Sequence, residues 1–197
     1  MIKTVCVFCG SGTGGNEDYS TKAEYLGLFL TERNIGLVYG GANVGLMRVI
    51  ADTMIGCGGE VTGVMPVALV EREVAHDNLT EMHIVSDMQE RKSLMAKLSD
   101  AFIAMPGGYG TFDEIFEVLT WNQLGIIQKP IGLLNVNGYY NPLLEMMDRA
   151  VEEKFLRPEH RADLLVDEDV DLLWEKLNSY QPVTAQKWIE GLKAGKI

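Results

Sequence analysis

Short runs of apolar, β-branched residues alternate with segments of helical hydrophobic period along almost the whole chain. The apolar runs predict strands at residues 4–9, 36–39, 60–65, 81–85, 101–105, 130–134 and 164–166. The helical period predicts helices at 19–32, 44–57, 88–99, 111–124, 142–153 and 170–180, with a short last helix near 185–192. Because the strands are apolar nearly throughout, they predict a mainly parallel sheet with helices on both faces.

This alternation predicts an α/β fold, a single doubly wound Rossmann-like domain over residues 1–197. No repeat, linker or low-complexity tract divides the chain. In such folds ligands bind outside the carboxyl ends of the strands, where the strand order reverses. Glycine clusters follow three of the predicted strands, at 10–12, 40–41 and 107–108. We therefore expect a cleft floored by backbone at that edge of the sheet.

The most informative of these turns has the sequence PGGYGT at residues 106–111 and joins a predicted strand to a predicted helix. Its glycines let the backbone approach a ligand, and the helix N-terminus offers unpaired N–H groups and a positive dipole end. The turn therefore predicts a phosphate site, and Glu114 adds a carboxylate one helical turn away. Thr111-x-x-Glu114 also has the spacing of a capping box, so a purely structural role for Glu114 stays open.

The cation for a bound phosphate is expected from Arg91. On the predicted helix 88–99, Arg91 falls on the same face as the apolar residues Met88, Met95 and Leu98. A guanidinium that continues a core-facing stripe indicates a cleft that holds an anion. The alternative for Arg91 and the adjacent Lys92 is a solvated helix face with packed aliphatic stems.

The bulk composition excludes several classes of function. A formal net charge of −11 argues against binding to nucleic acid, and it requires local cations or backbone N–H groups to hold an anionic substrate. No apolar run is long enough to span a membrane, and the N-terminus lacks a signal-peptide pattern, so we expect a cytoplasmic protein with no membrane partner.

Two common cofactor motifs are incomplete, and no metal site is visible. GSGTGG at residues 10–15 matches the dinucleotide fingerprint, but the second strand ends without the acidic residue that holds the ribose. The turn at 106–111 lacks the Gly-Lys-Ser/Thr ending of a nucleotide triphosphatase loop. Cys6 and Cys9 have CxxC spacing within a strand, where residues three apart face opposite sides. We therefore expect no metal and no cofactor.

Several motifs together resemble the LONELY GUY family of cytokinin riboside 5′-monophosphate phosphoribohydrolases, sometimes labelled possible lysine decarboxylases. They are CVFCGS at 6–11, YGG at 39–41, GLM at 45–47, RK at 91–92, PGGYGTxxE at 106–114 and TWxQLG at 120–125. The likeness continues through KPIGLLN at 129–135 and GYY at 138–140.

The resemblance implies a homodimer or higher oligomer that hydrolyses the N-glycosidic bond of a purine nucleotide, AMP or N6-prenylated AMP, without cofactor or metal. It implies that Arg91 and Glu114 are the catalytic pair. The substrate-binding residues that it implies are Ser11, Glu73, Lys92, Gly107, Gly108, Tyr109, Gly110, Thr111 and Thr120.

The chain departs from the family pattern at three positions. Gln89 stands where the family usually has histidine, which argues against a role for that side chain. Ala42 and Arg48 stand where the family usually has glycine, which predicts altered helix packing or an altered cleft wall. Two other functions stay open. One is a non-catalytic nucleotide or cofactor carrier on the same scaffold. The other is a pyridoxal-phosphate decarboxylase, although no lysine lies in a recognisable Schiff-base setting.

Overall fold

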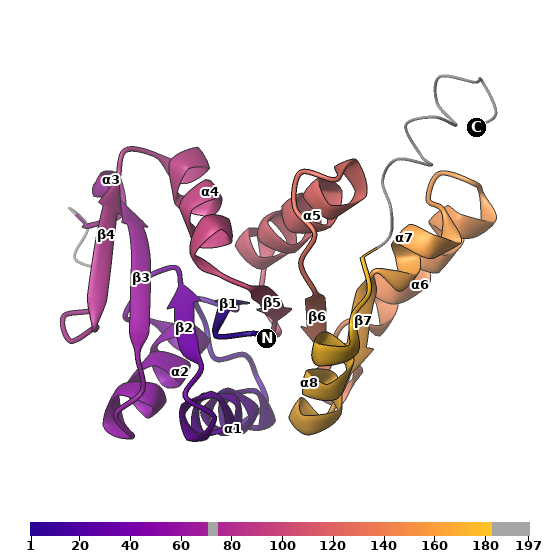
Figure 1. Ribbon diagram of the computed structural model, residues 1–197. Helices are drawn as coiled ribbons and strands as arrows, with labels where there is room; N and C mark the ends of the chain where they lie inside the picture. Colours follow the sequence, from indigo (N-terminus) through magenta and orange to yellow (C-terminus); the bar gives the residue numbers. More distant parts are fainter. Residues whose placement is uncertain (71–74, 183–197) are drawn as a thin grey trace.

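The computed structural model describes residues 1–70 and 75–182, and its centre is a seven-stranded sheet (Figure 1). The strands are β1 (Thr4–Phe8), β2 (Gly36–Tyr39), β3 (Val61–Pro66), β4 (Glu81–Val85), β5 (Ala101–Ala104), β6 (Ile131–Leu134) and β7 (Leu164–Asp167). Their order is β4-β3-β2-β1-β5-β6-β7, and each neighbouring pair is parallel. All seven predicted strands are confirmed, and this sheet is parallel throughout.

The helices are α1 (Asp18–Glu32), α2 (Gly45–Gly56), α3 (Val67–Val70), α4 (Met88–Leu98), α5 (Tyr109–Leu124), α6 (Asn141–Glu152), α7 (Pro158–Ala162) and α8 (Val170–Ser179), with a 3-10 turn η1 (Val136–Gly138). Six of them confirm the predicted helices. The short elements α3, α7 and η1 were not predicted, because they are too short to show a helical period. The predicted helix near 185–192 lies outside the described residues.

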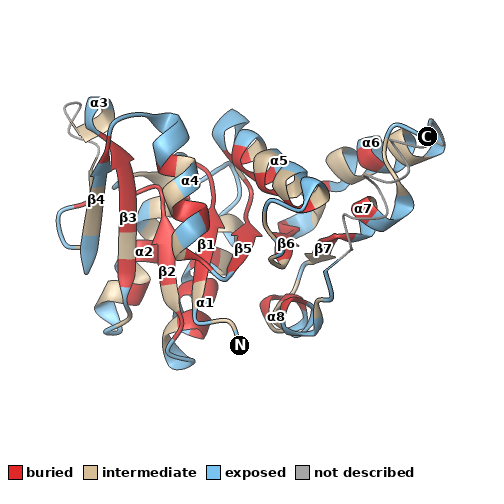
Figure 2. Ribbon diagram, turned by 45° about the horizontal axis from the view of Figure 1, so that its top comes forward, coloured by how far each residue is buried: buried red, intermediate tan, exposed pale blue. Residues whose placement is uncertain are grey.

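Two hydrophobic cores lie on the two faces of the sheet, as the doubly wound prediction requires. One core packs α1, α2 and α8 against the sheet, and the other packs α4, α5 and α6. Figure 2 shows the buried strands between these helices. Cys6 belongs to one core and Cys9 to the other, so the prediction that they face opposite sides is confirmed. Burial raises the pKa of both thiols.

The strand order reverses between β1 and β5, and this determines where the loops that follow neighbouring strands separate. From β1 the chain builds outward through β2, β3 and β4, and then returns to the other side of β1 for β5, β6 and β7. The loops after β1 and β5 therefore leave the same edge of the sheet toward opposite faces. The three predicted glycine clusters follow β1, β2 and β5 at this edge, as expected.

Candidate active site

The glycine turns after β1 and β5 are joined by backbone contacts. The Gly10 N–H donates to the Pro106 carbonyl at 3.0 Å, and the Leu46 N–H donates to the Gly10 carbonyl at 3.1 Å. A Cβ at Gly10 would lie 3.4 Å from the Gly107 Cα, so these two backbones pass closely. The turns thereby form one continuous surface of main chain.

A cleft of about 350 Å³ lies above these turns. It is lined by the loop 10–14, the turn 106–108, Tyr19, Leu46 and Tyr139. The structure thus brings the predicted Ser11, Gly107 and Gly108 to one cleft, and Ser11 is exposed there. A Cβ at Gly12 or Gly108 would meet nothing within 4 Å, so this main chain faces open space.

The helix behind the cleft begins earlier than the sequence indicates. α5 starts at Tyr109 with Gly108 as its N-cap, whereas the predicted start was residue 111. The first-turn N–H groups therefore belong to residues 109–111, next to the glycine turn. Tyr109 is 93% exposed and Thr111 only 3% exposed, with the Thr111 hydroxyl close to Gly107. Thr111 is not the N-cap, so the capping-box alternative for Glu114 is wrong.

Glu114 instead forms a buried ion pair with Arg91. The Arg91 Nη1 donates to the Glu114 Oε1 at 2.8 Å, and each residue is 8% exposed. The Arg91 Nε donates to the carbonyl of Val64, within β3, at 3.1 Å. A Cβ at Gly40 would overlap the Arg91 guanidinium, so the second glycine turn provides the space that Arg91 fills. The predicted catalytic residues are therefore in direct contact.

Burial shifts the acidity of this pair. Removal from water raises the pKa of the Glu114 carboxyl, and the Arg91 charge and hydrogen bond oppose that rise without cancelling it. A carboxylate with a raised pKa is a stronger base than an ordinary glutamate. The Glu114 carboxylate can therefore accept a proton more readily than an ordinary glutamate while Arg91 keeps it in a fixed orientation.

Local structure at the start of α4 positions Arg91. Asp87 is the N-cap and accepts the Glu90 N–H at 2.8 Å, while Glu90 Oε2 accepts both the Ser86 N–H and its hydroxyl. This capping holds the first helical turn, so Arg91 projects toward the sheet. Met95 shares the buried face, but Met88 is 45% exposed, so the predicted apolar stripe was wrong at its first position.

Lys92 contacts α5 through two other carboxylates. Its Nζ lies 3.0 Å from Asp113 Oδ2 and 3.1 Å from Glu117 Oε1. Desolvation opposes the charged form of Lys92, but the two carboxylates outweigh it and raise the Lys92 pKa. Acidic residues early in a helix, such as Asp113 and Glu117, are also favoured by the helix dipole. Their pairing with Lys92 across two helices left no signal in the sequence.

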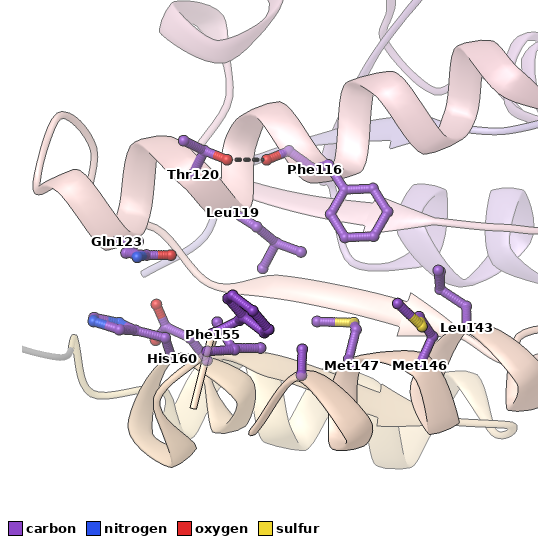
Figure 3. Close-up of a pocket in the computed structure, with 12 residues that line it drawn as sticks. Phe116, Leu119, Thr120, Gln123, Leu143, Met146, Met147, Phe155 and His160 are labelled. Carbon is purple, nitrogen blue, oxygen red and sulfur yellow. Dashed lines mark hydrogen bonds between the residues drawn. The ribbon is translucent and has the colours of Figure 1, made fainter. Parts of the chain in front are cut away.

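The structure does not bring every predicted residue to the cleft. Arg91, Lys92 and Glu114 lie on the sheet face covered by α4 and α5, whereas the cleft is lined from α1 and α2. Thr120 lies in a different cavity, of about 330 Å³, between α5 and α6, and its hydroxyl donates to the Phe116 carbonyl at 2.7 Å (Figure 3). Its contact with substrate stays a prediction.

Glu73 lies outside the described residues. Of the three departures from the family pattern, Gln89 and Arg48 are exposed. Ala42 is 8% exposed and forms an isolated antiparallel bridge with Ala75. Arg48 is not among the residues that line the cleft, so the altered cleft wall is not found there, and its effect on helix packing stays a prediction.

Two tyrosines at the cleft were missed by the sequence analysis. The rings of Tyr19 and Tyr139 meet edge to face with centroids 6.0 Å apart, and both line the cleft. The Tyr139 hydroxyl donates to the Gly107 carbonyl at 2.6 Å. The available signal was the position of Tyr139 just beyond a predicted strand, at the edge where ligands bind.

Residues 1–70 and 75–182 contain no group of three or more histidine, cysteine or acidic side chains placed to hold a metal ion. Within the same ranges, none of the helices combines the length and the apolar character needed to cross a membrane.

Comparison with known proteins places these features in one family. Residues 47–177 match the family model described as “Possible lysine decarboxylase”. A cytokinin riboside 5′-monophosphate phosphoribohydrolase of Arabidopsis thaliana is 49% identical over 181 residues, which cover 92% of this chain and 85% of the relative. A rice protein (Oryza sativa subsp. japonica) named “Probable cytokinin riboside 5'-monophosphate phosphoribohydrolase LOGL2” is 49% identical over 192 residues, covering 95% and 79%.

Solved structures show the same fold at lower identity. The molybdenum cofactor carrier protein of Chlamydomonas reinhardtii aligns with a TM-score of 0.66 and 18% identity, over 91% of this chain and 100% of that chain. The molybdenum cofactor binding protein of Rippkaea orientalis aligns with a TM-score of 0.63 and 20% identity, over 100% and 99%. These likenesses show the fold alone. The family model and the close relatives go further, and the chain belongs to the family of the cytokinin riboside 5′-monophosphate phosphoribohydrolases.

Proposed function

We propose that this protein hydrolyses the N-glycosidic bond of adenosine-type 5′-monophosphates, AMP or N6-prenylated AMP, to free base and ribose 5-phosphate. The observation that carries this proposal is the buried Arg91–Glu114 pair, in which Glu114 belongs to the helix that begins at the glycine turn. The names of relatives that are 49% identical over 92% of the chain or more support the same reaction.

The 5′-phosphate would bind at the turn 107–111. The residues proposed to hold it are Gly107, Gly108, Tyr109, Gly110 and Thr111 at the start of α5, with Ser11 across the cleft. Main-chain N–H groups and the helix dipole attract the anion, which matters because the formal net charge of −11 repels it at long range. Lys92 adds a cation on the α5 side.

The chemistry follows from the charge that develops on the ribose. As the C1′–N bond breaks, its electron pair leaves with the purine and the ribose gains oxocarbenium character. The Glu114 carboxylate stabilises that charge and takes a proton from the water that attacks C1′. Arg91 holds the carboxylate at 2.8 Å and keeps it oriented. Clamping of the phosphate fixes C1′ relative to Glu114, so dephosphorylated substrate reacts poorly.

The lysines near this region do not support decarboxylase chemistry. Imine formation needs a neutral amine, but the carboxylates of Asp113 and Glu117 raise the pKa of Lys92 and keep it charged. Burial lowers the pKa of Lys129, but its Nζ donates to the Ala96 and Ser99 carbonyls. Lys129 also precedes β6, so it lies at the edge of the sheet opposite the cleft.

The test is chromatography of the free base released from AMP, N6-isopentenyl-AMP and adenosine. We expect base and ribose 5-phosphate in equal amounts from at least one of the two nucleotides, and little base from adenosine. A carrier would bind AMP and return it intact. Cleavage of adenosine as fast as AMP would contradict the role given to the phosphate clamp.

We also propose that the protein is a homodimer. Exposed apolar side chains gather at the groove between α5 and α6, where Phe116, Met146 and Phe155 are 40%, 66% and 88% exposed (Figure 3). A second copy that covers this groove would remove them from water. Light scattering after gel filtration should give twice the chain mass, and the Met146→Asp/Phe155→Asp variant should give the mass of one chain. A monomeric wild type would contradict this proposal.

We place the activity in the cytoplasm, because Cys6, Cys9 and Cys57 are all free thiols. Recovery of the protein from an oxidising compartment would contradict this location.

A further inference from the structure

Neighbouring tyrosines after β6 make matching hydrogen bonds to the segment that carries the glycine turn. The Tyr139 hydroxyl donates to the Gly107 carbonyl, and the Tyr140 hydroxyl donates to the Met105 carbonyl, both at 2.6 Å. Their surroundings differ. Tyr140 is 1% exposed in the core, whereas Tyr139 is 38% exposed and lines the cleft. One bond therefore belongs to the interior and the other to the ligand site.

Tyr139 contacts a peptide bond whose two flanking residues do little to restrain its rotation. It joins Gly107 to Gly108, and neither glycine has a Cβ to limit rotation of the plane. In a trans peptide the C=O and the following N–H point to opposite sides, so fixing the Gly107 carbonyl also fixes the direction of the Gly108 N–H. The phenol also covers a carbonyl oxygen whose negative end would otherwise face an anion.

The Tyr139 ring is itself held in place. It meets the Tyr19 ring edge to face at 6.0 Å and the Tyr140 ring edge to face at 4.9 Å. Asn135 and Asn141 hydrogen-bond to each other at 2.8 Å, and the Tyr140 N–H donates to Asn135 Oδ1 at 2.7 Å, which fixes the loop around the two tyrosines. The hydroxyl therefore reaches Gly107 from a rigid support.

We propose that Tyr139 is a positioning residue for the anion site: its hydroxyl locks the Gly107–Gly108 peptide in the orientation that receives the 5′-phosphate. The inference rests on the proposed function for the identity of that phosphate. Tyr139 acts through the main chain and has no part in breaking the C1′–N bond.

The experiment compares Tyr139→Phe with Tyr140→Phe, each of which loses one phenol–carbonyl bond and keeps its ring. Calorimetry with ribose 5-phosphate should show affinity lowered about threefold to tenfold in Tyr139→Phe, the loss typical of one hydrogen bond. Its KM for AMP should rise in proportion while kcat stays within about twofold of wild type. Tyr140→Phe should lower Tm, because a buried carbonyl loses its donor, and should leave the affinity unchanged.

Unchanged ribose 5-phosphate affinity in Tyr139→Phe would overturn the inference, and so would an equal loss in both variants. A fall in kcat at constant KM would also overturn it, because Tyr139 would then act on the chemical step. If wild type releases no base from any purine nucleotide but Tyr139→Phe still weakens ribose 5-phosphate binding, the proposed function fails and the inference stands.

Discussion

Adjacent residues of α4 form ion pairs with α5 in contrasting environments. Arg91 pairs with Glu114 in a nearly water-free contact, where both side chains are 10% exposed. The Lys92 side chain is 11% exposed, but it pairs with Asp113 and Glu117, whose side chains are 61% and 20% exposed. Arg91 and Glu114 are separated by almost as many residues as Lys92 and Asp113. The direction in which each side chain leaves its helix therefore determines which pair is buried.

The difference in burial gives the pairs different uses. A buried pair has little net effect on stability relative to apolar residues, but the loss of one partner leaves an uncompensated charge. An exposed pair contributes little because water and salt screen it. Burial also raises the pKa of Glu114, which makes it a useful base. We therefore assign the chemistry to the buried pair and an anchoring role to the exposed one.

The largest effect should come from replacing the carboxylates one at a time. Glu114→Gln keeps the shape and removes the base, so kcat for AMP should fall about 10²–10⁴-fold. Asp113→Asn is the matched control on the preceding residue and should keep kcat within about threefold of wild type. Steady-state base release measures both. Equal losses in the two variants would remove the distinction between the pairs.

Breaking the pairs from the α4 side should separate them by stability. Arg91→Met strands the buried Glu114 and should lower the free energy of unfolding by about 3–5 kcal/mol. Lys92→Met leaves behind carboxylates that water reaches more easily than Glu114, above all Asp113, and should lower it by about 1 kcal/mol. Urea titration followed by circular dichroism gives both values. If Lys92→Met lowered the free energy of unfolding as much as Arg91→Met, side-chain exposure would not explain the difference between the pairs.

The space that Gly40 leaves for the guanidinium offers a subtler way to disturb the buried pair. In Gly40→Ala the new methyl overlaps Arg91, whose flexible end must move, so kcat/KM should fall about tenfold to hundredfold. Gly56→Ala is the control, because a Cβ there meets nothing within 4 Å. Retained activity in Gly40→Ala would mean that the position of the guanidinium is not critical.

The smallest effect should be a shift in the pH profile. Glu114 acts as a base only when ionised, so kcat should fall as pH drops through its pKa, and the raised pKa puts that fall above the range of an ordinary glutamate. Arg91 opposes the rise, so Arg91→Met should move the acidic limb to still higher pH. Lys92→Met should move it much less, because the charge of Lys92 lowers the pKa of Glu114 less than the charge of Arg91 does. If the acidic limb of the kcat profile moved to lower pH in Arg91→Met, its assignment to Glu114 would be wrong.

The sequence predicted most of this fold because periodicity reports burial directly. The apolar runs became the seven strands, and the six long helices followed from their 3.6-residue period. Arg91 was found because a charge on a core-facing stripe needs a partner. The start of α5 was misplaced by two residues, since glycine and tyrosine are weak helix formers and tertiary contacts override such preferences.

Contacts between distant segments could not be predicted in the same way. Tyr139 reaches Gly107 across 32 positions in the chain, and Lys92 reaches Asp113 across 21. No local pattern encodes such distances, because they depend on which strands become neighbours. The separation of Thr120 from the cleft has the same cause: the turns of α5 aim Thr120 at α6, whereas Glu114 faces α4.

The most direct test of the account is a crystal structure of Glu114→Gln with AMP bound, since this variant should hold the nucleotide without cleaving it. We expect the 5′-phosphate on the main-chain N–H groups of residues 107–111 and C1′ facing the side chain at position 114. AMP bound with its phosphate away from this turn, or with the ribose on the far side of α5 from Arg91, would contradict the central claim.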